Sequence, residues 1–212
     1  MNDVPYIDLH THTHHFEVLC VVSYGIGTGQ PFPEAPCVSA GVHPWDAERV
    51  DMTEAIRFLS TAKIAAIGEI GLDFSRQIDR DRQVDVFREQ LAIAEKRNLP
   101  VILHCVKAYN EVLKTVSEFD LKAAVFHSYI GSPELASTIT GKGYYISVSE
   151  RSLKSKKTIE SISNTALGRI FAETDTSEVS IEHVYNAIAA IKKIEITELK
   201  HIIFNNFKKI TE

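Results

Sequence analysis

Apolar residues along this chain gather in short runs, separated by polar stretches and by turns rich in glycine or proline. Runs of this length that are rich in valine and isoleucine are typical of buried β-strands. We therefore predict eight strands, near residues 4–12, 17–23, 36–42, 64–70, 100–105, 122–127, 143–149 and 169–174.

Most segments between these runs place their apolar residues three and four positions apart, which is typical of an amphipathic helix. Val84, Phe87, Leu91 and Ala94 follow this spacing in one such segment. Helices are predicted over residues 53–62, 79–97, 107–119, 132–141, 153–166, 180–193 and 196–209.

Strands that alternate with helices predict a parallel sheet, and eight such strands predict an α/β fold of the (β/α)8 TIM-barrel type. The early part departs from this regularity, because there is no room for full helices between the first three strands. Residues 25–34 are dense in glycine and proline and predict an irregular loop. We expect one domain over residues 1–212, with helices distorted or missing after the first two strands.

Composition places the chain among ordinary globular proteins. Its 212 residues are 44% hydrophobic and 24% charged, enough for one sizeable core, and the net charge of −5 argues against broad adhesion to nucleic acid. No apolar stretch approaches the length of a membrane span, and nothing indicates an obligate protein partner. The three cysteines lack paired spacing, and the N-terminal residues lack the features of a signal peptide. Both observations predict a cytoplasmic protein.

Five of the apolar runs end on side chains that can bind a metal ion. His10 and His12 stand two residues apart, so they project from one face of a strand and can hold one ion together. The other candidates stand where a strand gives way to a loop, and in a parallel barrel such ends meet on the face that carries the chemistry. They are Glu69, His104, His127 and Asp175. Six mixed ligands exceed the needs of one ion, which indicates a two-metal hydrolase.

Each candidate also has a structural interpretation. Glu69 could form a salt bridge, because a carboxylate on so apolar a strand is costly to bury unless it is paired or bound to a cation. His104 or His127 alone could be a hydrogen-bonded core residue, and Asp175 could cap the following helix. Their joint occurrence at strand ends favours metal binding.

Two further residues are candidates for substrate contacts. His43 could touch substrate or orient a ligand, although a structural role is equally open. Arg151 begins a basic run that ends at Lys157 and follows the seventh predicted strand. Such a run can bind phosphates, although it is more often the solvated start of a helix.

Six motifs, taken in order, resemble those of the TatD family of metal-dependent deoxyribonucleases, within the amidohydrolase-like TIM-barrel superfamily. Four of them are the Asp-x-His-x-His opening, Gly-x-His-Pro, Gly-Glu-x-Gly-Leu-Asp and the closing Glu-Thr-Asp. In this chain they read Ile7-Asp8-Leu9-His10-Thr11-His12, Gly41-Val42-His43-Pro44, Gly68-Glu69-Ile70-Gly71-Leu72-Asp73 and Glu173-Thr174-Asp175. The two later histidine strands, ending at His104 and at His127-Ser128, complete the resemblance.

The resemblance implies a ligand set and a reaction. His10, His12, Glu69 and Asp175 would hold one ion, and Glu69 would bridge to a second ion completed by His104 and His127. The two divalent ions, Zn²⁺, Mg²⁺ or Mn²⁺, would activate a water for attack on DNA, with Asp175 as general base and Glu69 as a further catalytic group. Imidazole and carboxylate ligands together do not select among these ions.

Departures from the family pattern concern the substrate loops. Where the family commonly has an arginine after the fifth-strand histidine, this chain has Val106 and then Lys107, which makes Lys107 a candidate substrate contact. The Arg-Asn-x-Pro segment after Glu-Thr-Asp is missing. Two alternatives to a deoxyribonuclease therefore stay open: a metal-dependent hydrolase of a small ester, amide or phosphoester, and a metal-binding scaffold whose nuclease activity has decayed.

Overall fold

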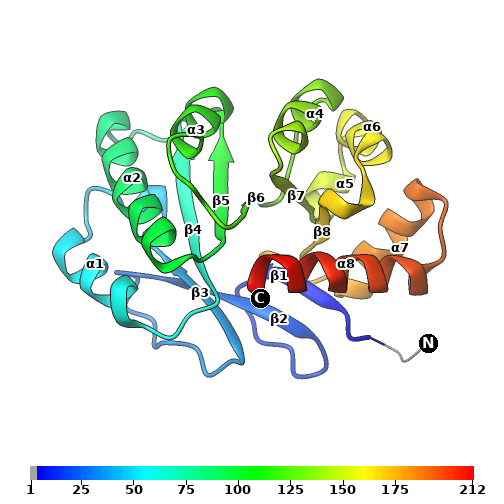
Figure 1. Cartoon of the computed structure of the whole chain (residues 1–212), viewed down its shortest axis with the longest axis horizontal. Coiled ribbons are helices and arrows are strands. Elements are labelled where there is room, and N and C mark those ends of the chain that lie inside the picture. The colour runs from blue at the N-terminus through cyan, green and yellow to red at the C-terminus, as the bar shows by residue number, and fades with distance from the viewer. Residues whose placement is uncertain (1–3) are drawn as a thin grey trace. The chain divides into compact units, whose positions relative to one another are not determined.

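A computed structural model describes residues 4–212, which form eight strands, eight α-helices and two short 3-10 helices (Figure 1). The strands are β1 (Ile7–Thr11), β2 (Leu19–Gly25), β3 (Cys37–Gly41), β4 (Ala66–Asp73), β5 (Val101–Val106), β6 (Ala124–Phe126), β7 (Tyr145–Val148) and β8 (Ile170–Ala172). The α-helices are α1 (Met52–Thr61), α2 (Arg80–Arg97), α3 (Tyr109–Val116), α4 (Pro133–Gly141), α5 (Glu150–Leu153), α6 (Lys156–Asn164), α7 (Ile181–Lys192) and α8 (Ile196–Thr211). The 3-10 helices are η1 (Pro44–Asp46) and η2 (Leu167–Arg169).

The chain divides into two compact units. The first unit contains residues 4–21 and Phe126–Glu212, and the second contains Val22–Val125. The strands follow chain order along one eight-stranded sheet, as the alternation of apolar runs and helices predicts. The single domain expected over residues 1–212 stays a prediction, and each unit is described separately below.

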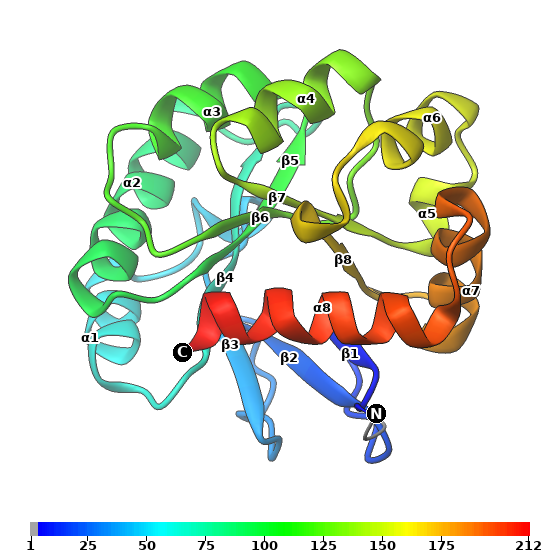
Figure 2. The same ribbon diagram turned by 45° about the vertical axis from the view of Figure 1, so that its right-hand side comes forward.

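In the first unit, β7 pairs in parallel with β8, and β8 lies beside β1. Thr11, at the end of β1, forms a parallel bridge with Asp175, so the first strand and the segment after the last strand meet at their carboxyl ends. Helix α8 packs against β1 and β8 (Figure 2). The buried Tyr185 hydroxyl donates to the carbonyl of Ile7 at 3.1 Å and accepts from its amide at 3.0 Å, which fixes α7 to β1.

In the second unit, β4 pairs in parallel with both β3 and β5, and α2 packs on β4. The register between β4 and β5 shifts between Ile67 and Ile70, at the position of Glu69. Irregularities of this kind redirect a side chain and are frequent beside active sites. Gly71 is required nearby, because it has a φ of +140° and a Cβ there would stand 2.1 Å from the His104 carbonyl oxygen.

In each unit, a cation in the last turn of one helix donates hydrogen bonds to carbonyls at the end of the preceding helix. Arg97, in the last turn of α2, donates to the carbonyls of Leu59 and Ala62 at the end of α1. In the first unit, Lys192, in the last turn of α7, donates to the carbonyls of Ser163 and Thr165 at the end of α6, each at 2.7 Å. These contacts satisfy terminal carbonyls that a helix leaves without an internal partner.

The predicted helix gaps are confirmed within the described residues, because β1, β2 and β3 follow one another without an intervening helix. The helix expected over 153–166 is wrong in its bounds. Two helices occupy this region, α5 and α6, and the second begins where the Ser155 hydroxyl accepts a hydrogen bond from the Thr158 amide at 3.3 Å. A serine that caps a helix in this way interrupts the helix before it.

Two findings bear on the setting of the chain. Cys20, Cys37 and Cys105 form no disulfide among the described residues. Among residues 4–212, no helix combines the length and the apolar character that a membrane crossing requires.

Candidate functional site

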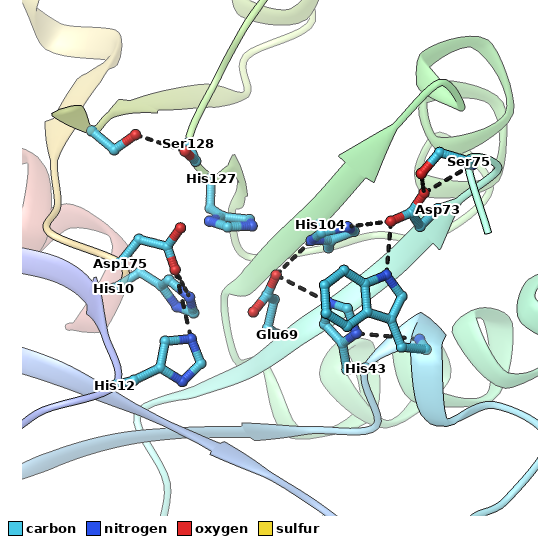
Figure 3. Close-up of polar contacts among 12 residues, drawn as sticks. His10, His12, His43, Glu69, Asp73, Ser75, His104, His127, Ser128 and Asp175 are labelled. Atoms are coloured by element: carbon cyan, nitrogen blue, oxygen red, sulfur yellow. Dashed lines mark hydrogen bonds and ion pairs between the residues drawn. The ribbon is translucent and has the colours of Figure 1, made fainter. Parts of the chain in front are cut away.

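The first unit brings together three imidazoles and one carboxylate. The ligand atoms of His10, His127 and Asp175 all lie within 4.8 Å of one another. His12 joins them, with its Nε2 3.6 Å from Asp175 Oδ1, while His10 Nε2 lies 3.8 Å from the same oxygen (Figure 3). We call these four residues the first cluster.

Backbone pairing at the end of β1 positions two of these groups. The Asp175 amide donates to the His10 carbonyl at 2.9 Å, and the His12 amide donates to the Asp175 carbonyl at 3.3 Å. Asp175 has a positive φ of 55°, a conformation that aspartate adopts more readily than most residues. His10 is fully buried, whereas the side chain of His12 is 44% exposed. The cluster therefore has a buried end and an open end.

A buried carboxylate orients the His127 ring. Glu173 Oε1 lies 3.3 Å from His127 Nδ1, and the Ser147 hydroxyl donates to the other carboxylate oxygen of Glu173. A carboxylate on one imidazole nitrogen fixes the ring and leaves the other nitrogen available as a ligand.

A second buried carboxylate holds the segment before Asp175. Asp8 accepts hydrogen bonds from the Thr174 amide at 3.0 Å and from the Thr174 hydroxyl at 2.6 Å. Burial raises the pKa of Asp8 to about 7, although the two hydrogen bonds from Thr174 act in the opposite direction. Asp8 thus anchors β1 to the segment that carries Asp175.

A cavity of about 850 Å³ lies beside His12 and Asp175 in the first unit. Its lining includes no lysine or arginine. The carboxylates along it belong to Asp8, Glu17, Asp175, Glu178 and Glu182. Such a lining gives the cavity a negative character.

The second unit brings together two imidazoles and one carboxylate. The ligand atoms of His43, Glu69 and His104 all lie within 4.8 Å of one another. Glu69 Oε1 stands 2.6 Å from His104 Nδ1 and 3.3 Å from His43 Nε2 (Figure 3). We call these three residues the second cluster, in which His43 follows β3, whereas Glu69 and His104, predicted at strand ends, lie within β4 and β5.

Asp73 supports His104 on its other nitrogen. Asp73 Oδ2 lies 3.3 Å from His104 Nε2 and accepts a hydrogen bond from Trp45 Nε1 at 2.7 Å, while Asp73 Oδ1 accepts from the Ser75 hydroxyl at 2.5 Å. Burial acts to raise the pKa of Asp73, but the hydrogen bonds from Ser75, Trp45 and His104 outweigh it and lower the pKa to about 2. Asp73 is therefore a carboxylate at neutral pH.

The six predicted metal ligands fall into these two clusters. His10, His12, His127 and Asp175 lie together in the first unit, and Glu69 and His104 lie together in the second. Their role as ligands stays a prediction.

The candidate substrate contacts have different surroundings. His43, predicted to touch substrate or to orient a ligand, lies within the second cluster, and its role stays a prediction. Lys107 and Arg151 are both exposed, and neither forms a salt bridge among the described residues.

Sequence reasoning assigned no role to Asp8, Asp73 or Glu173, although all three stand inside the quoted motifs. The alternation of side chains along a strand could have identified Asp73, because positions 69 and 73 share one face. The partner of Asp8 is Thr174, just after β8, and the partner of Glu173 is Ser147 in β7, so both contacts join distant parts of the sequence and leave no sequence signal.

Comparison with known proteins gives a consistent result. Residues 26–212 match the family model described as TatD related DNase, so the match begins after the first histidine motif. A Bacillus subtilis protein named uncharacterized metal-dependent hydrolase YabD is 31% identical over 196 residues, which cover 80% of this chain and 75% of the relative. The 3'-5' ssDNA/RNA exonuclease TatD of Erwinia tasmaniensis is 37% identical over 119 residues, which cover 52% of this chain and 45% of that protein.

Solved structures show the same fold. The crystal structure of YjjV, a TatD homolog from Escherichia coli, superposes with a TM-score of 0.82 over 97% of both chains at 21% identity. A TatD-family hydrolase from Entamoeba histolytica gives a TM-score of 0.78 over 98% of both chains at 19% identity. The predicted (β/α)8 fold class is thereby confirmed.

Proposed function

This chain belongs to the TatD-related DNase family, and we propose that it is a metal-dependent hydrolase that cleaves phosphodiester bonds of single-stranded DNA. The observation that carries the proposal is the pair of clusters, each of which offers imidazole and carboxylate donors within 4.8 Å of one another. The names of the relatives support the hydrolase class and a nucleic-acid substrate.

The donor chemistry of both clusters fits a divalent ion. Two imidazoles and one carboxylate are a frequent protein ligand set for catalytic zinc, and they also suit manganese. We propose one ion in each cluster, held by His10, His12, His127 and Asp175 in the first and by Glu69 and His104 with His43 in the second. A bridging role of Glu69 stays a prediction from the family resemblance.

When bound, such ions would lower the pKa of a coordinated water and offset the negative charge of the phosphate. Asp175 is the general base, accepting the proton of the attacking water at a carboxylate oxygen. Its side chain is 10% exposed and adjoins the cavity, so water can reach it. Its backbone is held by hydrogen bonds with the backbone of His10 and His12.

Two buried carboxylates fix the donor atoms of the imidazoles. Asp73 would accept a hydrogen bond from the Nε2–H of His104, which leaves Nδ1 directed at Glu69. Glu173 would accept a hydrogen bond from the Nδ1–H of His127, which leaves Nε2 of that ring for a ligand role. Both are positioning residues, since they act through the histidines.

One observation favours a second candidate function. The cavity beside Asp175 is lined by carboxylates without a lysine or arginine, so a polyanion gains nothing from entering it. A hydrolase of a small uncharged ester or amide would suit that lining better than a nuclease. We propose a cytoplasmic location for either reaction, because the three cysteines lack the paired spacing of a disulfide framework.

Cleavage of end-labelled single-stranded DNA tests the proposal. The full-length protein is incubated with the oligonucleotide in Mg²⁺, Mn²⁺ or Zn²⁺, and in parallel with bis(4-nitrophenyl) phosphate and 4-nitrophenyl acetate. We expect ion-dependent shortening of the DNA that a chelator abolishes. Turnover of 4-nitrophenyl acetate without DNA cleavage would establish the second candidate, and no turnover of any substrate would contradict both.

A further inference from the structure

An exposed tryptophan stands beside the second cluster. The Trp45 side chain belongs to η1, directly after His43, and is 43% exposed. Its ring packs edge-on against His43, with centroids 4.7 Å apart, and its Nε1 donates to Asp73 at 2.7 Å. The indole is thus fixed in place by the same residues that position a candidate metal ligand, while much of its surface faces solvent.

An arginine lies over this ring. The Arg76 guanidinium carbon is 4.2 Å from the centroid of the Trp45 ring, and Arg76 is itself exposed. No carboxylate pairs with Arg76 among the described residues. Its charge is therefore held near the second cluster without being neutralised.

Another stacked arginine of the same unit provides a contrast. Arg88 lies 5.6 Å from the Phe119 ring centroid, but its guanidinium also pairs with Glu118 at 2.6 Å. A paired guanidinium of this kind has a structural explanation. Arg76 lacks such a partner, and the available charge points to an anionic ligand instead.

We propose that Trp45 and Arg76 form a nucleotide-binding platform for a single strand, on which Arg76 binds a backbone phosphate and the Trp45–Arg76 stack receives a nucleobase. The inference rests on the proposed function and names the part of the substrate that adjoins the second cluster. Unstacked bases bind to aromatic rings and to guanidinium planes, while arginine also pairs with phosphate. Double-stranded DNA would gain less, because its bases are already stacked.

The position of the platform explains how a chain of net charge −5 could hold a polyanion near its candidate ligands. Because the indole is already fixed by His43 and Asp73, binding costs little of its conformational freedom. The base contact would be tolerant of sequence, since every base presents a stacking face.

Intrinsic fluorescence tests the platform directly, because Trp45 is the single tryptophan of the chain. The full-length protein, with the ion that supports cleavage, is titrated with a labelled phosphorothioate oligothymidylate that resists hydrolysis. A matched abasic oligomer carries the same backbone without bases. Anisotropy of the label reports binding, and tryptophan emission reports stacking.

We expect the base-bearing oligomer to quench Trp45 emission and to bind about 5- to 150-fold more tightly than the abasic one, the range for stacking of one base. Trp45→Leu should remove this preference, whereas Trp45→Phe should retain most of it. The second result separates stacking from loss of the hydrogen bond to Asp73.

Arg76→Ala should weaken binding of both oligomers and reduce the slope of log affinity against log salt by about 0.7, the value for one phosphate contact on a single strand. Arg88→Ala, which removes the same charge and one stacked pair, should leave that slope unchanged. Binding and cleavage without quenching or a base preference would overturn the platform and leave the proposed function intact. Absence of both binding and cleavage would overturn both.

Discussion

The two clusters differ in how firmly their donors are held. In the second cluster, His104 contacts a carboxylate through each ring nitrogen, Glu69 at 2.6 Å and Asp73 at 3.3 Å. In the first cluster, His12 is 44% exposed on its side chain, and Asp175 lies 3.6 Å from it. The second cluster is therefore fixed by hydrogen bonds, whereas the first cluster has one side open to solvent.

The surroundings of the clusters differ in charge as well. The cavity beside the first cluster has carboxylates and neither lysine nor arginine in its lining, whereas an arginine without a carboxylate partner lies beside the second. The surroundings of the two clusters therefore favour ligands of different charge.

The largest expected effect comes from the open cluster. Asp175→Asn keeps the size of the side chain but removes its ability to accept a proton, so cleavage should fall by roughly 10²- to 10⁴-fold. The rate of oligonucleotide shortening measures this. Glu160→Gln, at an exposed position of α6, is the matched control and should retain the wild-type rate. Equal activity of both variants would remove Asp175 from the role of base.

Glu69→Ala tests whether the two clusters share a ligand. If Glu69 bridges two ions, this one substitution should lower metal content from two ions per chain to none, because both sites lose a donor. Mass-spectrometric metal analysis after dialysis measures the content. His127→Ala serves as the comparison and should cost one ion only. Retention of one ion by the Glu69 variant would restrict Glu69 to the second cluster.

Asp73→Asn and Glu173→Gln compare the supporting carboxylates of the two clusters. Each should weaken metal affinity by about 10- to 100-fold, the usual cost of losing a partner that orients a ligating histidine. Competition with a fluorescent chelator measures the affinity. Asp81→Asn, at an exposed position of α2, provides the control. An affinity equal to that of the control would show that the carboxylates do not position the rings.

The smallest expected effects concern the helix ends. Two substitutions remove these cations: Arg97→Met in the second unit and Lys192→Met in the first. Each leaves carbonyls at the end of the preceding helix without their donor, and each should lower the free energy of unfolding by about 1 kcal/mol. Urea denaturation gives this value. Lys208→Met breaks only an exposed pair with Glu212 and should change stability by less than about 0.5 kcal/mol. A loss no larger than this control would mean that solvent replaces the caps.

Much of the fold follows from local patterns in the sequence. The strand order follows chain order, and the absence of helices between the first three strands follows from their spacing. The short helix α5 was not predicted, and α6 begins three residues after the start of the predicted helix, because Ser155 caps its first turn. A cap formed by one hydroxyl therefore sets a helix boundary that the apolar spacing does not show.

The sequence predicts which site residues lie side by side only where those residues belong to one strand. Alternation on one strand places His10 beside His12, but nothing local brings His43 to Glu69. That contact depends on the turn into η1 after β3 and on the register shift in β4. Trp45 and Arg76 are likewise 31 residues apart in the sequence and meet only in the folded unit.

The central claim is that metal ions bound by the two clusters support DNA cleavage. A metal titration in which the cleavage rate is measured at each step tests this claim most directly. The metal-free full-length protein receives increasing amounts of the ion that gives the fastest cleavage, and bound metal and the rate on single-stranded DNA are measured at each step. We predict that activity rises with occupancy and reaches its maximum at two ions per chain. Full activity at one ion, or no cleavage at full occupancy, would contradict a hydrolase built from these two clusters.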